Sequence, residues 1–346
     1  MKEINILSLV RHNVKRLKPY SSARDDFQGS AFVFLDANEN PFPTPYNRYP
    51  DPHQHLLKEV VALLKNVQPD SIFLGNGSDE AIDLLFRVFC EPGHDSVLIP
   101  QPTYGMYAVC AHVNDVTVIA PSLSHLFALD AQAILNAVQG NTKLIFLCSP
   151  NNPSGNLLDE DQIEIILRSF SGLVVIDEAY IDFARSKGWA TRLLEFQNLV
   201  ILQTLSKAWG LAGLRLGMCF AHPEIIALIN KIKPPYNINT FTQQEAMKTL
   251  QLGKARHDDM VDAILRERET LSKNLIGLPI VRKIHPSHAN FILVEVTDAT
   301  HQYDQLVGKG VIVRDRSSVS LCANCLRITV GTREENHLLI QAMRLL

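Results

Sequence analysis

Short apolar runs and amphipathic stretches alternate along the middle of the chain. The apolar runs are continuous, which is typical of strands with both faces covered. We predict strands at 71–74, 96–99, 116–119, 143–148, 173–176, 199–203 and 216–220. Helical patterns separate most of them, at 79–90, 104–112, 131–138 and 160–170. This alternation predicts a wound, mostly parallel sheet with helices on both faces.

After residue 220 the spacing of apolar positions changes. We predict helices at 223–231, 242–252, 255–276, 300–309 and 333–345, and strands at 290–296, 311–314 and 325–330. These elements describe a smaller α/β unit that the chain reaches through the long charged helix. We therefore divide the chain into an N-terminal arm with part of the small domain (1–45), a large ligand-binding domain (46–254) and a small C-terminal domain (255–346).

Apolar residues in the first 19 positions recur at helical spacing. They follow one another at intervals of three or four residues, at Ile4, Leu7, Val10, Val14 and Leu17. This spacing predicts an amphipathic helix that packs on the body of the protein or on a partner subunit.

The overall composition is that of an ordinary globular protein. Of its 346 residues, 46% are hydrophobic and 20% are charged, and the formal net charge is −3. This balance argues against a nucleic-acid binder, which carries a marked basic excess. No apolar run approaches the roughly 18 residues of a membrane span. Polar interruptions near the N-terminus argue against a secretory signal.

Six cysteines are scattered, mostly inside apolar segments, which is typical of buried thiols in a reducing compartment. We therefore predict a cytoplasmic protein. Cys322 and Cys325 form a Cys-x-x-Cys pair, which can bind a metal or take part in redox chemistry. Because no second pair stands at zinc spacing, a loop holding two thiols is the better interpretation, and we predict no metal site.

Candidate chemistry lies in polar segments after the predicted strands, where wound sheets bind their ligands. Gly75–Glu80 follows the first strand and begins a helix, so its first-turn N–H groups can hold an anion. A plain helix cap at Ser78 or Asp79 explains the segment equally well. The segment lacks the full glycine pattern of a dinucleotide site and the lysine of a phosphate-binding loop, which argues against NAD and ATP.

Two further loops carry aromatic and amide side chains. Tyr104 follows the second strand, where it can stack on a flat ligand ring or pack on a helix start. Asn152 lies in Ser149–Gly155, which has two asparagines and two prolines. That loop is either a tight turn or a rigid holder for an amide donor.

Charged residues follow the next strands. Asp177 follows strand 173–176, with Tyr180 in the same turn. A buried carboxylate there is unfavourable unless it pairs with a cation, although a capping role is the alternative. Lys207 follows strand 199–203 among hydroxyl residues, and a desolvated lysine is a usable amine nucleophile. Arg215 is a cation suited to a phosphate.

Together these side chains describe one ligand. Its phosphate would lie at the Gly75–Asp79 turn, Ser206 and Arg215, and its flat ring at Tyr104. A cationic ring nitrogen would face Asp177, and a ring oxygen would face Asn152 and Tyr180. An aldehyde would lie at Lys207. Pyridoxal phosphate carries all of these groups, and we predict it as the cofactor.

With these motifs, nearly the whole chain resembles the fold-type I pyridoxal-phosphate enzymes of the aminotransferase superfamily. More narrowly, it resembles the histidinol-phosphate aminotransferase family. The resemblance also rests on segments Leu17–Tyr20, Leu35–Pro41, Asn47–Pro50, Lys233–Asn237, Ala289–Leu293, Gly310–Asp315 and Cys325–Thr332. It implies a large domain with a seven-stranded sheet and a small α/β domain. The segment 316–324 does not align with the family's pattern.

The resemblance implies a role for each matching residue. Lys207 would form the covalent aldimine with the cofactor and move the substrate proton. Asp177 would keep the ring nitrogen protonated so that the ring can accept electrons. The other implied cofactor contacts are Tyr180 and Asn152 to the phenolic oxygen, Tyr104 on the ring, and Ser78, Asp79, Ser206 and Arg215 to the phosphate.

The resemblance also implies a homodimer, in which Tyr49 would reach the phosphate of the partner's cofactor. Arg327 would bind the substrate anion, and Tyr20, Asn38 and Arg314 would line the same end. The implied reaction is a ping-pong transamination in histidine biosynthesis. It converts L-histidinol phosphate and 2-oxoglutarate to imidazole acetol phosphate and L-glutamate. Because a guanidinium can fork onto a phosphate or a carboxylate, the same arginines can serve both substrates.

Related activities stay open at this point. An aromatic amino acid aminotransferase or a threonine-phosphate decarboxylase would share Lys207 and Asp177, so the cofactor motifs do not separate them. A non-catalytic α/β binding protein would have no need for a lysine, an aspartate and an arginine near successive strand ends. A nicotinamide dehydrogenase is disfavoured because the glycine pattern is missing.

Overall fold

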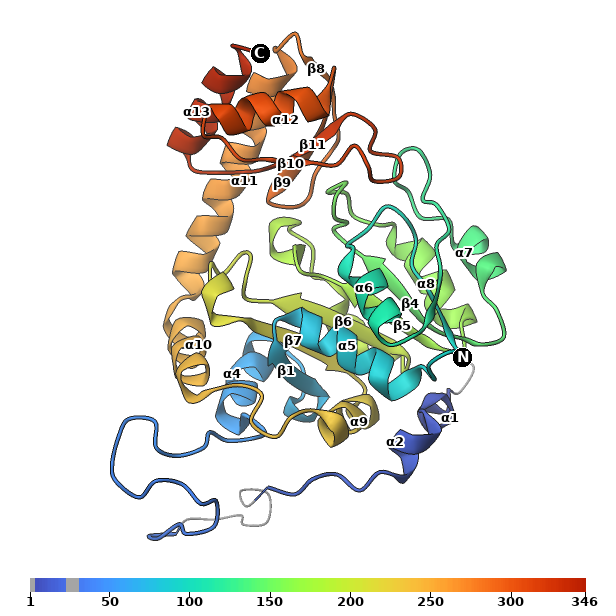
Figure 1. Cartoon of the computed structure of the whole chain (residues 1–346), viewed down its shortest axis with the longest axis vertical. Helices are drawn as coiled ribbons and strands as arrows, with labels where there is room; N and C mark the ends of the chain where they lie inside the picture. Colours follow the sequence, from blue (N-terminus) through green and yellow to red (C-terminus); the bar gives the residue numbers. More distant parts are fainter. Residues whose placement is uncertain (1–3, 23–30) are drawn as a thin grey trace.

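The chain forms two sheets that are joined through one long helix, α11 (Lys254–Ile276) (Figure 1). The computed structural model describes residues 4–22 and 31–346. Within those residues, no helix has the length and apolar character that a membrane crossing requires.

The larger sheet has seven strands in the order β1-β7-β6-β5-β4-β2-β3. Their bounds are β1 (Ile72–Asn76), β2 (Ser96–Leu98), β3 (Thr117–Ile119), β4 (Thr142–Cys148), β5 (Leu173–Asp177), β6 (Leu199–Thr204) and β7 (Leu216–Ala221). Only β7 pairs with its neighbours antiparallel. The predicted mostly parallel, seven-stranded sheet is confirmed.

Helices cover both faces of this sheet, because successive strand residues point to opposite sides. In β4, Phe146 faces one hydrophobic core, whereas Ile145 and Leu147 face the other. The Phe146 side holds α1 (Ile6–Leu9), α2 (His12–Arg16), α5 (Ser78–Phe89), α6 (Met106–Val113) and α9 (Pro223–Ile232). The other side holds α4 (His55–Lys65), α7 (Ala131–Ala137), α8 (Glu160–Ser169) and α10 (Thr240–Leu252).

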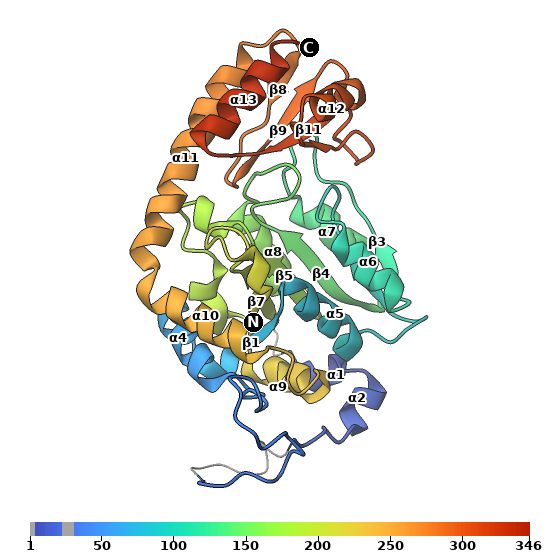
Figure 2. The ribbon, with the colours of Figure 1, turned by 60° about the vertical axis from the view of Figure 1, so that its left-hand side comes forward.

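The smaller sheet is antiparallel, with the order β10-β11-β9-β8. Its strands are β8 (Val281–Ile284), β9 (Phe291–Val296), β10 (Arg314–Asp315) and β11 (Cys325–Thr329). It shares a core with α11, α12 (Ala299–Gly308) and α13 (Arg333–Met343). Figure 2 shows α11 running from α10, beside the large sheet, up to this small domain.

The prediction of one amphipathic helix in the first 19 residues is wrong. The structure has α1 and α2 instead, with Val10 and Arg11 in extended conformations between them. The backbone N–H of Arg11 donates to the carbonyl of Val88 at 2.9 Å, so this turn is tied to α5 rather than to its own helix. Val10 and Val14 are nevertheless buried, as expected for the apolar side of the segment.

Several elements differ from the sequence prediction. Helix α4 was not predicted, and the usual starting signal is missing because Gln54 makes no side-chain cap and has a φ of 52°. Strand β8 was not predicted because Arg282 and Lys283 interrupt its apolar pattern. The strand expected at 311–314 is reduced to the two residues of β10.

Short 3-10 helices complete the connections. They lie at Pro69–Ser71 (η1), Ile181–Phe183 (η2), Trp189–Glu195 (η3) and Ala212–Leu214 (η4). η4 directly precedes Arg215, whose left-handed backbone, with a φ of 53°, turns the chain into β7. This turn brings a predicted phosphate-binding arginine back to the edge of the sheet.

Candidate active site

A cavity of about 250 Å³ opens at the carboxyl ends of the parallel strands. It is lined by Gly77, Ser78, Asp79, Tyr104, Cys148, Asn152, Asp177, Ala179, Tyr180, Thr204, Ser206, Lys207 and Arg215. The structure thus brings together every residue predicted to contact the cofactor except Tyr49. Strands far apart in the sequence meet here because the sheet pairs them side by side.

The turn from β1 into α5 forms one end of the cavity. Gly77 has a φ of +72°, and a Cβ atom there would lie 2.7 Å from Nη2 of Arg215. Gly217 of β7 lies so close that a Cβ would stand 2.1 Å from the backbone nitrogen of Ser78. Helix α5 has no side-chain cap, so its first-turn N–H groups can bind an anion.

Arg215 adds positive charge at the same end. Its Nη2 lies 3.8 Å from Oδ2 of Asp79, and Tyr104 Oη donates to Oδ1 of Asp79 at 3.2 Å. Both members of the ion pair are partly exposed, so their attraction is weak. Arg215 therefore keeps the capacity to bind a phosphate.

A buried carboxylate forms the floor of the cavity. Asp177 is only 3% exposed; its Oδ2 accepts a hydrogen bond from Tyr107 Oη at 2.6 Å, and its Oδ1 accepts one from the Ala179 N–H at 3.0 Å. Burial raises the pKa of Asp177 despite these two donors. A cationic group of a ligand in the cavity would stabilise the ionised form.

Lys207 provides an amine at the cavity mouth. Its Nζ lies 5.6 Å from the centre of the Tyr180 ring. The sequence led us to expect a buried amine, but the side chain is reachable from solvent through the cavity. The pKa of Lys207 is lowered, first by the burial it does have and then by Arg327. A lowered pKa enlarges the neutral fraction that can act as a nucleophile.

The small domain contributes Arg327 of β11. Its Nη1 donates to Oδ1 of Asn152, and its guanidinium lies 5.2 Å from the centre of the Phe291 ring. Tyr180 meets the same ring edge-on, with a centroid distance of 5.1 Å. Burial, followed by the charge of Arg316, lowers the pKa of Arg327. A cation held in this way favours an anionic ligand.

Sequence reasoning missed two residues beside the cavity, Arg316 and Tyr107. Arg314 pairs with Arg327 across β10 and β11, and Arg316 follows two positions later, so all three belong to one face of this ladder. Among the residues that the structure describes, Nε of Arg316 and of Arg327 is buried without a hydrogen-bond partner. The period-two spacing of Arg314 and Arg316 was the available signal.

Five predicted site residues do not line this cavity: Arg314 and Arg327, described above, and Tyr20, Asn38 and Tyr49. Asn38 and Tyr49 line a separate groove of about 770 Å³ together with Glu39, Arg48 and Phe241, among others. Tyr49 is 51% exposed and stacks on Tyr236 at a ring distance of 4.4 Å. Tyr20 is 75% exposed. Within one chain, these side chains are therefore not assembled with the arginines.

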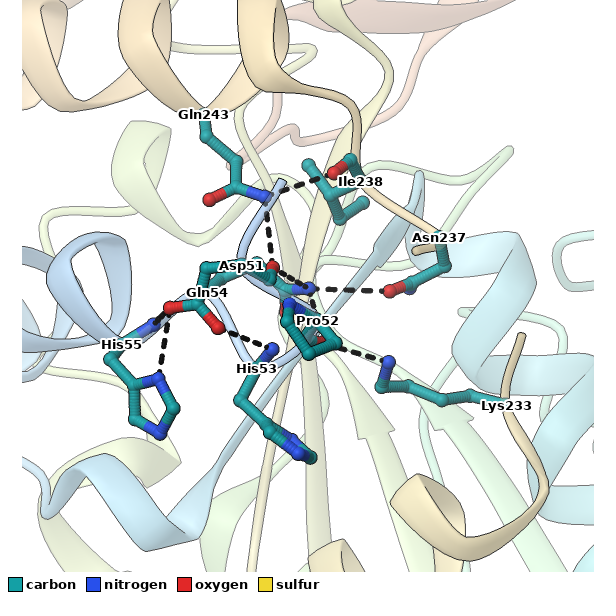
Figure 3. A network of polar contacts seen from close by, with 9 residues as sticks. All are labelled: Asp51, Pro52, His53, Gln54, His55, Lys233, Asn237, Ile238 and Gln243. Atoms are coloured by element: carbon teal, nitrogen blue, oxygen red, sulfur yellow. Dashed lines mark hydrogen bonds and ion pairs between the residues drawn. The ribbon is translucent and has the colours of Figure 1, made fainter. Parts of the chain in front are cut away.

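Figure 3 shows how the chain after Tyr49 is held on the large domain. Lys233 Nζ donates to the carbonyl of Pro52 at 2.8 Å, and Gln243 Nε2 donates to the carbonyl of Asp51 at 3.2 Å. The Asp51 carboxylate accepts from the backbone N–H groups of His53 and His55. These bonds anchor one end of the loop that carries Tyr49.

Known proteins resemble the chain over nearly its full length. A histidinol-phosphate aminotransferase of Parabacteroides distasonis is 56% identical over 340 residues, which cover 98% of each chain. One from Cytophaga hutchinsonii is 53% identical over 97% of this chain and 98% of that protein.

Solved structures show the same fold. The histidinol-phosphate aminotransferase of Clostridium acetobutylicum has a TM-score of 0.79 at 23% identity, covering 86% of this chain and 90% of that one. That of Sinorhizobium meliloti, in complex with pyridoxal-5′-phosphate, has a TM-score of 0.76 at 22% identity, with coverages of 86% and 82%. The L-threonine-O-3-phosphate decarboxylase of Porphyromonas gingivalis has a TM-score of 0.74 at 23% identity, with coverages of 86% and 90%.

The structural likeness at these identities establishes the fold alone, and this is the predicted fold-type I architecture. The family itself follows from sequence. The family model for aminotransferases of class I and II matches residues 37–343. Because that match spans most of the chain and agrees with the close relatives, the chain belongs to the class I and II aminotransferase family.

Proposed function

We propose that the protein transfers the amino group of L-histidinol phosphate to 2-oxoglutarate, a step of histidine biosynthesis. The products are imidazole acetol phosphate and L-glutamate. The observation that carries this proposal is the identity of 53–56% to proteins named histidinol-phosphate aminotransferase, over at least 97% of both chains. The arginines of β10 and β11 support it, because they suit a phosphate-bearing substrate.

The cavity fits pyridoxal 5′-phosphate. Gly77 leaves a concave turn beside Arg215, at the uncapped start of α5, which suits the phosphate. Asp177 at the other end is a buried carboxylate in need of a cation, which a protonated ring nitrogen supplies. When bound, pyridoxal phosphate carries the amino group between the two substrates and accepts electrons from the reacting carbon.

In the proposed site, each side chain has one task. Lys207 holds the cofactor covalently through Nζ and moves the proton at the reacting substrate carbon. Asp177 keeps the ring nitrogen protonated. Tyr180 and Asn152 hold the phenolic oxygen, since the Arg327 bond to Asn152 Oδ1 leaves Nδ2 to donate. Tyr104 stacks on the ring. The phosphate contacts are Ser78, Asp79, Ser206 and Arg215.

The substrate end binds two different anions in turn. Arg327 takes the phosphate of histidinol phosphate in one half-reaction and a carboxylate of glutamate in the other. Arg314 and Arg316 lie on the same face of the ladder and add charge that favours the doubly charged phosphate. Tyr20 and Asn38 would complete this end, although within one chain they lie apart from the arginines.

The working unit in this proposal is a homodimer in the cytoplasm. The groove beside Tyr49 carries exposed aromatic side chains at Tyr46 and Phe241, which a second copy of the chain would cover. Tyr49 would then reach the phosphate site of the partner. The cysteines are free and buried, which agrees with a reducing compartment.

A screen of half-reactions tests the substrate. The cofactor-loaded protein is mixed with histidinol phosphate, threonine phosphate, phenylalanine or glutamate, and its visible absorption is followed. We expect histidinol phosphate and glutamate to bleach the band, and 2-oxoglutarate to restore it. Carbon dioxide release from threonine phosphate, without transfer from histidinol phosphate, would favour the decarboxylase instead.

A further inference from the structure

A buried phenol stands directly behind the carboxylate on the cavity floor. Tyr107 of α6 is 0% exposed, and its Oη donates to Asp177 Oδ2 at 2.6 Å. The other oxygen of Asp177 accepts the N–H of Ala179. Each carboxylate oxygen therefore has one protein donor, which leaves lone pairs for a ligand in the cavity that Asp177 lines.

The Tyr107 ring cannot turn away from this position. It stacks on Phe146 with a ring distance of 4.8 Å and meets Tyr104 edge-on at 5.5 Å. Phe146 is itself stacked on Phe86 from α5 at 5.5 Å. Because Phe146 and Tyr104 contact the ring directly and Phe86 supports Phe146, the direction of the hydroxyl is set before any ligand arrives.

The surroundings of Asp177 shift the pKa of its carboxyl group in opposite directions. Its burial and the charge of Asp79 raise the pKa of the carboxyl, whereas Tyr107, the Ala179 N–H and Lys207 lower it. Tyr107 is the strongest of the lowering groups. Burial lifts the pKa of Tyr107 far above its ordinary value, so the phenol stays a donor at any working pH. Burial also raises the pKa of Cys148, which keeps that thiol neutral.

We propose that Tyr107 is a positioning residue for the cofactor. Its hydroxyl keeps Asp177 ionised and oriented, so that the carboxylate can hold the protonated ring nitrogen. This inference rests on the proposed cofactor site, and it is independent of which amine the enzyme accepts.

The test removes only the hydroxyl, with Tyr107→Phe in the full-length protein. Two probes are titrated: pyridoxal phosphate and its analogue with carbon in place of the ring nitrogen. We expect the dissociation constant of pyridoxal phosphate to rise roughly tenfold to hundredfold, the range for a lost hydrogen bond to a charged group. Affinity for the analogue should not change, because it has no ring nitrogen for Asp177 to hold.

Tyr303→Phe on α12 is the matched control, and it should leave both affinities unchanged. An equal loss for both probes would overturn the inference, since Tyr107 would then only shape the pocket. No loss for either probe would overturn it as well. If the unsubstituted protein binds neither probe, the proposed function fails instead.

A double variant covers the case in which Tyr107→Phe alone does not fold. In Tyr107→Phe, the buried Asp177 carboxylate has one hydrogen-bond donor fewer, which destabilises the folded protein. Combining Tyr107→Phe with Asp177→Asn removes that buried charge. Its affinity for pyridoxal phosphate should equal that of Asp177→Asn alone, because the carboxylate through which Tyr107 acts is gone. A further loss in the double variant would overturn the inference.

Discussion

The two ends of the proposed active site are built in different ways. The cofactor end comes from residues at the edge of one sheet, such as Asp177 at the end of β5 and Lys207 after β6. In the proposed site, the substrate end would combine Arg327 from the small domain with Tyr20 and Asn38 of the N-terminal arm, and none of these three residues lines the cavity. One rigid sheet therefore places the cofactor groups, whereas the substrate groups depend on how separate parts pack.

The two ends meet at the loop after β4. Arg327 donates to Asn152 there, and the N–H of His288 donates to the carbonyl of Gly155 at 2.6 Å. A Cβ on Gly155 would lie 2.6 Å from Oγ of Ser287. This close approach couples the position of the small domain to the loop that carries Asn152.

The largest effect should come from the cofactor end. Lys207→Ala should reduce transamination roughly 10⁴-fold or more, because it removes both the covalent anchor and the proton carrier. Activity is measured with histidinol phosphate and 2-oxoglutarate.

Borohydride reduction of the unsubstituted protein should label Lys207 in a peptide map. The exposed Lys309→Ala is the control, and label found on another lysine would contradict the assignment.

At the substrate end, Arg327→Leu should slow both half-reactions, by roughly 100-fold each. Truncating one partner of a buried charged interaction has an effect of this size. Single-turnover rates with histidinol phosphate and with glutamate measure the two halves separately. A loss confined to glutamate would show that another group binds the phosphate.

Arg316→Gln should have a smaller and more selective effect. We expect the KM for histidinol phosphate to rise about tenfold, with a smaller change for glutamate, because the phosphate carries more charge. Steady-state kinetics with each substrate provide the measurement. Equal changes in the KM for both substrates would show that Arg316 binds either anion and does not select for the phosphate.

Mixing two variants tests whether Tyr49 acts on the partner subunit. Tyr49→Phe should lower activity about tenfold by removing a hydrogen bond to the phosphate. After unfolding and refolding with an equal amount of Lys207→Ala, hybrid dimers should recover roughly a quarter of the normal activity, since each hybrid has one intact site. Without any recovery, Tyr49 would act within its own chain or not at all.

The last effect concerns stability near Asp177 rather than activity. Burial raises the pKa of Glu178 to about 7 from its ordinary value of 4.5. The folded state thus binds this proton more tightly, so the stabilisation present below pH 4.5 is lost as the pH rises toward 7. The loss is about 3 kcal/mol at most. Denaturant melts across this window should show a flatter pH profile for Glu178→Gln, and an unchanged profile would contradict the raised pKa.

Much of the large domain could be predicted because its signals are local. The run from Leu173 to Ile176 is apolar throughout, and a strand covered on both faces requires that pattern. Asp177 and Lys207 stand near strand ends, so parallel pairing alone predicts that they lie near one another. Helix α4 was not predicted because Gln54 precedes it without a side-chain cap. Strand β8 was not predicted because its charged residues interrupt the apolar pattern.

The sequence alone determined the large sheet, most of its helices and the chemical groups gathered at its edge, since burial of apolar side chains depends on spacing along the chain. Only the tertiary structure decided which partners those groups have. Tyr107 reaches Asp177 across 70 residues of sequence, and Arg327 reaches Asn152 across 175. Such bonds depend on how whole elements pack, and apolar spacing within one element carries no information about the distance between two of them.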